Sequence, residues 1–391
     1  MRLLILTREF PPGPGGIGTH AYQLACALQR RGWEIAVLTP QDYSTTDDAD
    51  HYNAAQPFPI TRLPSGRGAI TEFACRWQAL ARALGGQRPD VLLASGQRSV
   101  WLAALLARRY GVPWVAVGHG TEFGRKAGWQ AHVTRWAFRQ ATVVVCVSHF
   151  TQRLMHDLGV IPQAECVIPN GADADSFQVL PPDDVAAFRL RSKLSTGRLI
   201  LTVGNVTERK GQEVIIRALP WVLPAAPDTH YLMVGLPTLQ TELSILARQL
   251  GVEEHVHFLG RVSQDDLVYY LNVCDLFAMT SRMTHTGDCE GFGIAVVEAA
   301  LCGKPAIVSA DSGLAEAIVD GHTGLAVSAG DSQAVARALI SLLTRDAVRR
   351  EMGRSALRHA QHTQTWAQRG GEYEELLREI AQRIAQERVL P

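Results

Sequence analysis

Residues 277–309 read FAMTSRMTHTGDCEGFGIAVVEAALCGKPAIVS. The apolar run at 277–281 predicts a buried strand, and the segment 294–303, which ends at a glycine, predicts a helix. A second apolar run follows at 305–309. Strand, helix and strand in this order form the βαβ unit of parallel sheets. The stretch therefore predicts an α/β protein.

The same alternation of short apolar runs with helical patterns extends in both directions from this unit. In the first half, predicted strands cover 2–6, 34–39, 90–95, 114–118, 142–148 and 166–171. In the second half they cover 198–204, 230–235, 256–260, 275–280, 305–309 and 323–327. Each series suffices for one doubly wound parallel sheet with helices on both faces.

A polar, proline-bearing segment at 173–184 separates the two series. Such a break favours a linker between two domains near 173–190. We therefore expect a Rossmann-like N-terminal domain at 1–182 and a Rossmann-like C-terminal domain at 183–364. Residues 365–391 carry only a helical pattern, and 41–70, with little periodicity, are expected to be a surface excursion.

The composition argues against several classes of protein. Lys plus Arg equals Asp plus Glu at 38 each, which gives no support for a nucleic-acid binder. The apolar start at 3–6 is far shorter than the roughly 20 residues that span a bilayer. Seven cysteines without a C-x-x-C pair argue against a zinc site or a disulfide framework. We expect a cytoplasmic protein whose membrane contact, if any, is peripheral.

A glycine-rich turn follows the first predicted strand, where 8–20 read REFPPGPGGIGTH. Gly13, Gly15, Gly16 and Gly18 have no side chains, so a ligand can approach their backbone. The helix that follows directs its N-terminal amides at the turn, which suits a phosphate. Alternatively, the segment is an ordinary strand-to-helix turn that binds no ligand.

Two adjacent cations, Arg209 and Lys210, follow the first predicted strand of the second series. In a doubly wound sheet, ligands bind beyond the carboxyl ends of the strands, where these residues are expected. The pair could meet a pyrophosphate, or it could be a solvated pair at a helix start.

Two acids lie in the loop and helix of the unit at 277–309. Glu290 is in the loop, and Glu298 is in the helix beside Val296 and Val297. A glutamate near an apolar face is destabilising unless it accepts hydrogen bonds, and ribose hydroxyls are suitable donors. Alternatively, Glu298 is a capping or salt-bridged acid and Glu290 is a solvated loop residue.

One histidine, His119, lies at the end of the strand at 114–118, in a turn with Gly118 and Gly120. A lone histidine is often a structural group, so the turn alone does not assign a role. No His, Cys or Asp cluster has metal-ligand spacing, and no Ser-His-Asp arrangement can be read in line.

In order along the chain, these segments resemble the retaining nucleotide-sugar glycosyltransferases of glycosyltransferase family 4, which have the GT-B fold. The resemblance rests on PPGPGGIGTHAYQLACAL, GHGTEF, VVVCVSHFTQRL, VIPNGAD, TVGNVTERKGQ, GDCEGFGIAVVEAALCGKPAIVS and EAIVDGHTGLAV. It implies two facing Rossmann-like domains, with the acceptor bound mainly by the first and the nucleotide sugar by the second. It also implies that the last helix crosses back to pack on the first domain.

The resemblance further implies a role for each candidate residue. Glu290 would contact the hydroxyls of the donor sugar, and Glu298 those of the ribose. Catalysis is assigned to His119 near the reacting sugar, to Glu290, and to Lys210 and Arg209 at the diphosphate. Further donor contacts are implied for Gly15, Gly16, Asn205, Arg261, Val262, Phe292, Gly293 and Ile294.

The chain departs from the family pattern at two places. Asn205 stands where family members commonly carry an arginine, five positions before Lys210, and Arg209 is close enough to substitute for it. Ser312 and Gly313 stand where the family commonly has two glycines.

The resemblance implies a retaining hexosyltransferase that needs no cofactor and no metal. Its partners would be a nucleoside diphosphate sugar, with GDP-mannose first and a UDP-hexose second, and a hydroxyl acceptor. We expect front-face transfer in which the leaving diphosphate accepts the acceptor's proton. A sugar-nucleotide epimerase, a phosphorylase and a non-catalytic sugar-nucleotide binder are the alternatives, and the oligomeric state cannot be read.

Overall fold

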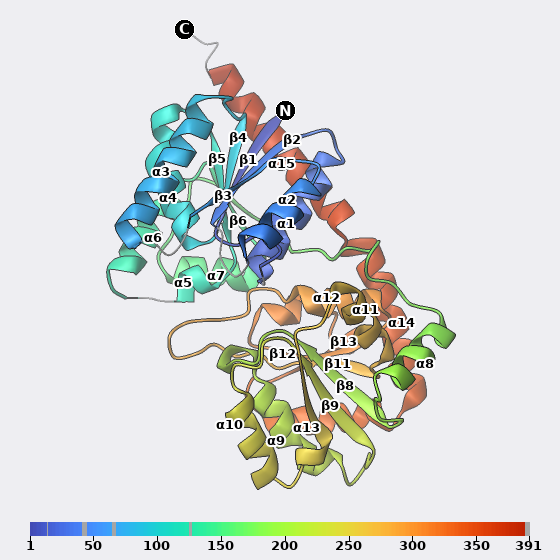
Figure 1. Ribbon diagram of the computed structural model, residues 1–391. Coiled ribbons are helices and arrows are strands. Elements are labelled where there is room, and N and C mark those ends of the chain that lie inside the picture. Colours follow the sequence, from blue (N-terminus) through green and yellow to red (C-terminus); the bar gives the residue numbers. More distant parts are fainter. Residues whose placement is uncertain (14, 41–44, 65–67, 125–126, 388–391) are drawn as a thin grey trace. The chain divides into compact units, whose positions relative to one another are not determined.

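The computed structural model describes residues 1–13, 15–40, 45–64, 68–124 and 127–387. The chain forms two compact units (Figure 1). The first unit contains residues 1–170 and the segment that begins at Trp366, and the second contains residues 171–365.

The first unit is built on a parallel sheet. Its strands are β1 (Arg2–Thr7), β2 (Glu34–Pro40), β3 (Ile60–Leu63), β4 (Val91–Ser95), β5 (Trp114–Gly118), β6 (Val143–Cys146) and β7 (Glu165–Val167). Its helices are α1 (Gly16–Gln29), α2 (Thr46–Ala54), α3 (Ala69–Gly85), α4 (Gln97–Tyr110), α5 (Thr121–Gly124), α6 (Trp129–Arg139), α7 (His149–Asp157) and α15 (Trp366–Glu387).

The strand order of the first sheet is β3-β2-β1-β4-β5-β6-β7, so the order reverses between β1 and β4. Strands β1, β4, β5 and β6 are buried almost completely, because helices cover both faces. Figure 1 shows α3, α4 and α6 on one side of the sheet and α1 and α15 on the other. This is the predicted doubly wound arrangement.

The region predicted as a surface excursion contains regular structure. Helix α2 and strand β3 lie within 41–70, so that prediction was wrong for 46–63; residues 41–44 and 65–67 lie outside the described residues. Helix α2 has a single buried residue, Ala49, and β3 is a four-residue edge strand that is partly exposed. Elements that bury so little carry little hydrophobic periodicity, which is why the pattern missed them.

The C-terminal helix α15 packs on the first unit, as the resemblance implies. It lies against α1, where a Cβ on Gly370 would come within 2.8 Å of the Ala27 Cβ. Glycine at this position therefore allows the two helices to approach closely. Arg31, just after the end of α1, links the two helices. It forms an ion pair with Glu374 at 3.0 Å and donates a hydrogen bond to the Ala367 carbonyl at 2.9 Å.

The second unit is built on a second parallel sheet. Its strands are β8 (Arg198–Val203), β9 (Thr229–Val234), β10 (Val256–Gly260), β11 (Leu276–Met279), β12 (Ala306–Ser309) and β13 (Gly324–Val327). Its α-helices are α8 (Pro182–Arg191), α9 (Gln212–Val222), α10 (Gln240–Gln249), α11 (Gln264–Val273), α12 (Ile294–Leu301), α13 (Ser332–Leu343) and α14 (Asp346–Thr363). Three short 3₁₀ helices are η1 (Glu208–Lys210), η2 (Glu253–His255) and η3 (Gly313–Ala317).

The strand order of the second sheet is β10-β9-β8-β11-β12-β13, so the order reverses between β8 and β11. One face is buried under α9, α10 and α13, whose apolar side chains surround Tyr231 and Met233. The unit at 277–309 becomes β11, α12 and β12, with β11 and β12 paired in parallel.

The boundary between the two units lies at Asn170, before the predicted linker at 173–190 and the predicted boundary at 182. Residues 178–180 are tied to the second unit by Asn272, which is 6% exposed. Its amide donates to the Gln178 carbonyl at 3.0 Å and accepts from the Leu180 amide at 2.9 Å. A buried side-chain amide has to be paired, so the extended chain here is part of the second unit's structure.

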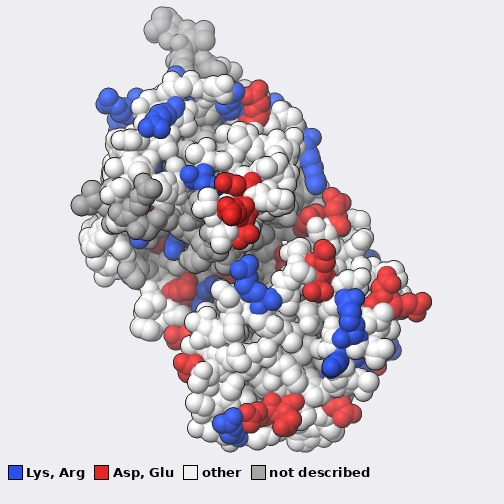
Figure 2. Space-filling view, viewed as in Figure 1, with Lys and Arg blue, Asp and Glu red and all other residues white. Residues whose placement is uncertain are grey.

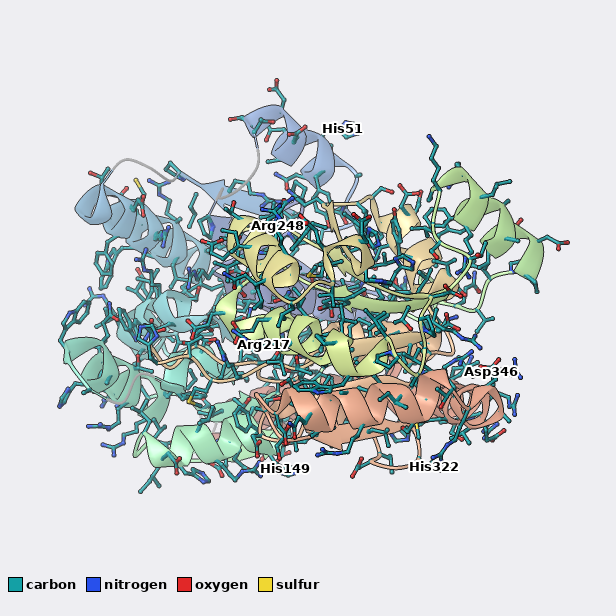
Figure 3. All side chains as sticks on the ribbon, turned by 90° about the horizontal axis from the view of Figure 1, so that it is seen from below. His51, His149, Arg217, Arg248, His322 and Asp346 are labelled. Atoms are coloured by element: carbon teal, nitrogen blue, oxygen red, sulfur yellow. The ribbon has the colours of Figure 1, made fainter. Side chains whose placement is uncertain are left out.

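A network of ion pairs lies at the amino-terminal ends of β8 and β11 in the second sheet. Arg349, on α14, lies 2.9 Å from Asp275 and 2.7 Å from Asp346, which is labelled in Figure 3. Arg198, at the start of β8, contacts the same two acids at 3.1 and 2.6 Å. The Arg349 side chain is buried, whereas Asp346 is partly exposed. The network therefore joins α14 to the start of β8 and to the residue before β11.

No helix among the described residues combines the length and the apolar character needed to cross a membrane.

We expect Arg349→Met to lower the free energy of unfolding of the second unit by about 2 to 4 kcal/mol. Removing one partner of a buried ion pair costs roughly 3–5 kcal/mol, and the partial exposure of Asp346 reduces that figure. Urea unfolding measures the effect. Arg350→Met is the matched control, since the exposed Arg350 reaches Asp346 only at 3.7 Å and should cost under about 1 kcal/mol. Equal losses in the two variants would contradict the role of the network.

Candidate functional site

The candidate donor site lies where the strand order of the second sheet reverses. Ligands of open α/β sheets bind beyond the carboxyl ends of the strands at such a reversal. Strand β8 leads into η1, which carries Arg209 and Lys210, and β11 leads into the loop 280–293, which carries Glu290. The fold thus brings together side chains that are 80 residues apart in the sequence.

Glu290 contacts both cations through the same carboxylate oxygen. Its Oε2 lies 2.8 Å from the Lys210 Nζ and also accepts a hydrogen bond from Arg209. Arg209 reaches the Asp288 carboxylate as well, at 3.2 Å. Glu290 and Lys210 are largely buried, whereas Asp288 is more exposed. The predicted pyrophosphate cations and the predicted sugar-binding acid therefore form one cluster of two cations and two carboxylates.

The electrostatics of this cluster keep Glu290 ionised. Burial alone would raise the pKa of Glu290, but the adjacent Lys210 and Arg209 outweigh it and lower the pKa to about 2. The Glu290 carboxylate in turn raises the pKa of Arg209. Burial lowers the pKa of Lys210, an effect that Glu290 opposes. Each charge is therefore held in the buried cluster by its neighbours.

Glycines allow the site's loops to touch. Gly211, with φ of +68°, packs against the Thr280 carbonyl, which a Cβ would approach within 2.1 Å. A Cβ on Gly313 would lie 1.9 Å from the Gly291 carbonyl oxygen. The Gly313 amide donates to the Glu290 carbonyl at 3.0 Å. These backbone contacts fix the loop that carries Glu290 between η1 and η3.

Helix α12 begins at the other side of this loop. Phe292 is buried, Ile294 is partly exposed, and Gly293 has φ of +89°, a conformation that favours glycine. No side chain caps the helix N-terminus with a hydrogen bond. The donor contacts that the resemblance implies for Phe292, Gly293 and Ile294 at this helix start stay predictions.

Glu298 lies on α12 and is partly buried. Burial raises the pKa of Glu298 to about 7, with Lys210 acting to lower it and Asp173 to raise it. The carboxyl group thus changes its charge near neutral pH, whereas Glu290 stays ionised. The two acids have different environments, consistent with the different roles that the sequence predicts for them.

Asn205 and Ser312, where the chain departs from its family, each have an internal partner. Asn205 accepts a hydrogen bond from the Leu236 amide at 3.1 Å and so joins the loops after β8 and β9. Ser312 is buried and its hydroxyl lies 2.9 Å from that of Ser309. Both substitutions are therefore accounted for by hydrogen bonds within the second unit.

Arg261 and Val262 follow β10, two strands away from β8 in the sheet. Arg261 is exposed and Val262 is partly exposed. Their predicted contact with the nucleotide base stays a prediction.

The first unit holds the remaining candidates. His119 follows β5, and its Nε2 lies 2.8 Å from the Ser95 Oγ. Burial lowers the pKa of His119 to about 4, so the imidazole is neutral at pH 7. Its backbone amide donates to Glu122 at 3.0 Å. Burial raises the pKa of Glu122 to about 7 although backbone amides donate to its carboxyl group.

The two candidate glycines in the turn after β1, Gly15 and Gly16, have different surroundings. An added Cβ on Gly15 would lie 2.0 Å from the Glu9 carboxylate, whereas one on Gly16 would have nothing within 4 Å. The absence of a side chain at Gly15 therefore makes room for the Glu9 carboxylate. The backbone of Gly16, by contrast, is open to a ligand.

Sequence reasoning missed three side chains of these clusters. Asp288 and Glu122 stand inside the quoted motifs, and an acid three residues after His119 in a glycine turn is a recognisable signal for an amide-binding carboxylate. His20 also stands in a quoted motif, but a single histidine there indicates no role by itself. It is fully buried, its ring lies 5.0 Å from that of His119, and its Nε2 is 3.1 Å from the Tyr373 hydroxyl on α15.

The arginines in and around the amphipathic segment 71–84, which the sequence offers for contact with an anionic membrane surface, differ in their surroundings. Arg62 bonds the Asn53 side chain and the Pro11 carbonyl, and Arg88 donates to the Gly111 carbonyl at 2.6 Å. Arg76 is partly buried, and Arg82 is exposed on α3. Arg67, also a candidate for contact with an anionic surface, lies outside the described residues.

No three His, Cys, Asp or Glu side chains in the described part of the chain form a group that could hold a metal ion.

Comparisons with known proteins match both units. Residues 14–176 match the model of Glycosyltransferase Family 4, and residues 187–359 match that of Glycosyl transferases group 1. The chain is 30% identical over 385 residues to the GDP-mannose-dependent alpha-(1-6)-phosphatidylinositol monomannoside mannosyltransferase of Mycolicibacterium smegmatis, covering 96% of this chain and 98% of the relative. It is 29% identical to the glycogen synthase of Mycobacterium tuberculosis, covering 91% and 89%.

Solved structures show the same fold. Anabaena HepE in complex with UDP and glucose has a TM-score of 0.82 and 21% identity, covering 97% of this chain and all of the other. The catalytic domain of starch synthase IV from Arabidopsis thaliana, bound to ADP and acarbose, has a TM-score of 0.77 and 17% identity, covering 97% and 99%. The predicted GT-B class, with two Rossmann-like parallel-sheet domains, is confirmed. Together with the relative that is 30% identical over nearly its full length, the matches show that this chain belongs to glycosyltransferase family 4 and is a glycosyltransferase.

Proposed function

We propose that the protein transfers mannose from GDP-mannose to a hydroxyl group of a lipid or glycan acceptor, with retention of the anomeric configuration and without a metal. The observation that carries the proposal is the cluster of Arg209, Lys210 and Glu290 at the reversal of the second sheet. The mannosyltransferase of M. smegmatis, similar along nearly the whole chain, supports the choice of donor.

The cations would stabilise the leaving diphosphate. Charge develops on that group as the glycosidic bond breaks, and preorganised cations stabilise it more effectively than water does. The Lys210 Nζ carries three hydrogens, and the described residues offer it Glu290 and the more distant Met279 sulfur as partners. A phosphate oxygen would complete the set, and the leaving diphosphate would accept the acceptor's proton.

The acids would divide the recognition of the donor. Glu290, held ionised beside the cations, would accept hydrogen bonds from the sugar hydroxyls, and Glu298 from the ribose hydroxyls. The amides of Phe292, Gly293 and Ile294 would bind phosphate or sugar oxygens. In the first unit, His119 with Gly16 would belong to the part of the protein that binds the acceptor and reacting sugar.

We also propose a peripheral contact with the inner face of a membrane, made by α4 and α6. Neither helix contains Asp or Glu, and both carry arginines in the last turn. Trp129 is 67% exposed, and Trp136 and Leu105 also face the solvent. Figure 2 shows Lys and Arg on the side of the first unit where Figure 1 draws α3 and α4. Exposed tryptophan with arginine suits an anionic lipid surface, and co-sedimentation with anionic vesicles tests the contact.

Purified protein should transfer mannose from GDP-mannose to a phosphatidylinositol mannoside, and the rate should persist in excess EDTA. The cations Arg209 and Lys210 take the place that a metal has in metal-dependent transferases, which is why no loss is expected. UDP-glucose and ADP-glucose assayed in parallel identify the donor. Transfer from another nucleotide sugar alone would overturn the choice of GDP-mannose. Loss of activity in EDTA that magnesium restores would overturn metal independence.

The affinity for GDP-mannose should rise about tenfold between pH 6 and pH 8, because only ionised Glu298 accepts two ribose hydroxyl bonds. With a pKa of about 7, the ionised fraction of Glu298 in the free protein increases by that factor over this interval. Calorimetry of the parent and of Glu298→Gln, which keeps the size but cannot ionise, measures it. Lys210 titrates in both proteins, so the difference between their pH dependences of affinity reports the ionisation of Glu298 alone. Equal pH slopes would refute the assignment.

Glu290→Gln should keep or tighten the binding of GDP while slowing mannosyl transfer at least tenfold. The change releases Arg209 and Lys210 from a carboxylate, yet it removes a charged acceptor worth roughly 1.5–3 kcal/mol to the sugar. Asp288→Asn is the control, because Asp288 contacts Arg209 but has no predicted sugar contact. Titration calorimetry and initial rates separate the two effects, and a parallel loss of GDP affinity and rate would rule out the division of labour.

A further inference from the structure

A buried serine of the first unit, Ser95, meets the ring of His119. Ser95 is the last residue of β4 and is 0% exposed, whereas His119 follows the neighbouring strand β5 and is partly exposed. The register of the two strands pairs Ser95 with Val117, so the parallel sheet itself places Ser95 and His119 close together. The Ser95 Oγ lies 2.8 Å from the His119 Nε2, which is a hydrogen-bond distance.

Two further contacts hold His119 in place. Its backbone amide donates to the Glu122 carboxyl group at 3.0 Å, which fixes the turn. Its ring packs edge to face against the fully buried ring of His20, with 5.0 Å between the ring centroids. Tyr373 holds His20 in turn, because its hydroxyl lies 3.1 Å from the His20 Nε2. A His119 ring that was turned over would present the carbon Cε1 to Ser95, so the bond to Ser95 selects the orientation of the ring.

The direction of this bond decides which ring nitrogen of His119 carries the hydrogen. Burial lowers the pKa of His119 to about 4, so the ring is neutral at pH 7 and has a single N–H. Within the described part of the chain, His119 is the one hydrogen-bond partner of the Ser95 Oγ. If Nε2 carried the hydrogen, the serine's own O–H would be a buried donor without an acceptor, which is destabilising. A serine that donates to Nε2 satisfies both groups and leaves the hydrogen on Nδ1.

We propose that Ser95 is a positioning residue that holds His119 as the Nδ1–H tautomer, so that His119 donates a hydrogen bond to an oxygen atom of the substrate. A histidine in this form cannot act as a general base through Nδ1. This agrees with a reaction in which the leaving diphosphate accepts the acceptor's proton. The tautomer follows from contacts within the first unit alone, whereas the meeting of His119 with the substrate rests on the proposed function.

Nuclear magnetic resonance of the full chain, labelled with nitrogen-15 in its histidine rings, tests the tautomer in the absence of any substrate. Chemical shifts and couplings to the ring hydrogens distinguish a nitrogen that carries hydrogen from one that does not, and His119→Gln assigns the signals of His119. We expect the parent protein to carry the hydrogen on Nδ1 at pH 7. Ser95→Ala removes the hydroxyl group and should move the hydrogen to Nε2, the form that free histidine favours in water. Ser95→Thr keeps a hydroxyl group and should keep the parent's pattern.

Ser99→Ala is the matched control for this measurement. Ser99 is also a buried serine, on α4, and it has no hydrogen bond to His119, so its loss should leave the His119 signals unchanged. A parent protein with the hydrogen on Nε2, or a tautomer that Ser95→Ala leaves unchanged, would overturn the proposal. Should Ser95→Thr unfold, which circular dichroism would show, the parent, Ser95→Ala and Ser99→Ala still decide the matter.

Steady-state rates connect the tautomer to mannosyl transfer. Ser95→Ala should lower kcat about tenfold, the loss expected for one hydrogen bond to the reacting substrate. The KM for GDP-mannose should change less than about twofold, because the nucleotide contacts are assigned to the second unit. Ser95→Thr should restore most of kcat, and Ser99→Ala should leave it unchanged. A Ser95→Ala variant with an altered tautomer and the parent's kcat would overturn the donor role of His119. A parent protein that transfers no mannose would refute the proposed function, and the tautomer would still be decided by resonance alone.

Discussion

The second unit's site depends on one shared carboxylate oxygen. Glu290 Oε2 accepts from Arg209 and lies 2.8 Å from the Lys210 Nζ, so the loop after β11 is held against the residues after β8. A largely buried carboxylate is destabilising without such partners, and the largely buried Lys210 is equally destabilising without the carboxylate. The interaction places three charged groups where the strand order reverses, which is where a doubly wound sheet can bind a ligand.

The backbone around this oxygen is as constrained as the charges. Gly211 and Gly313 bring neighbouring loops so close that a Cβ would collide with a carbonyl oxygen. Rigid loops preorganise the charged groups, so little reorganisation is needed when a diphosphate arrives. As a consequence, the two cations and two carboxylates of the cluster already balance one another's charge in the free protein. A donor whose diphosphate draws the cations away must therefore offer Glu290 other partners, and under the proposed function these are the sugar hydroxyls.

The sequence predicted the elements that are buried and periodic. Strand β5, which is buried throughout, was predicted without error, and α12 was predicted to start at Ile294, because buried parallel strands and packed helices carry long apolar runs. Helix α2 and strand β3 were missed, since both lie at an exposed edge. At the site, residue types and spacing marked Glu290, Lys210 and Arg209, but no local pattern reveals that they share an oxygen across 80 residues. Asn205, interpreted as a departure in ligand binding, has a partner that only the fold brings near, whereas Ser312 bonds Ser309, three residues before it.

The two units share one topology, but the arginine that follows the first strand has different partners in each. In both sheets the order reverses beside the first strand of the unit, and in both an arginine follows that strand, Arg8 after β1 and Arg209 after β8. In the second unit two carboxylates balance the two cations, so a ligand must compete for them. In the first unit Arg8 is exposed, and its positive charge acts to lower the pKa of the buried Glu122, which burial raises. An exchangeable ion pair suits a diphosphate that has to leave after transfer.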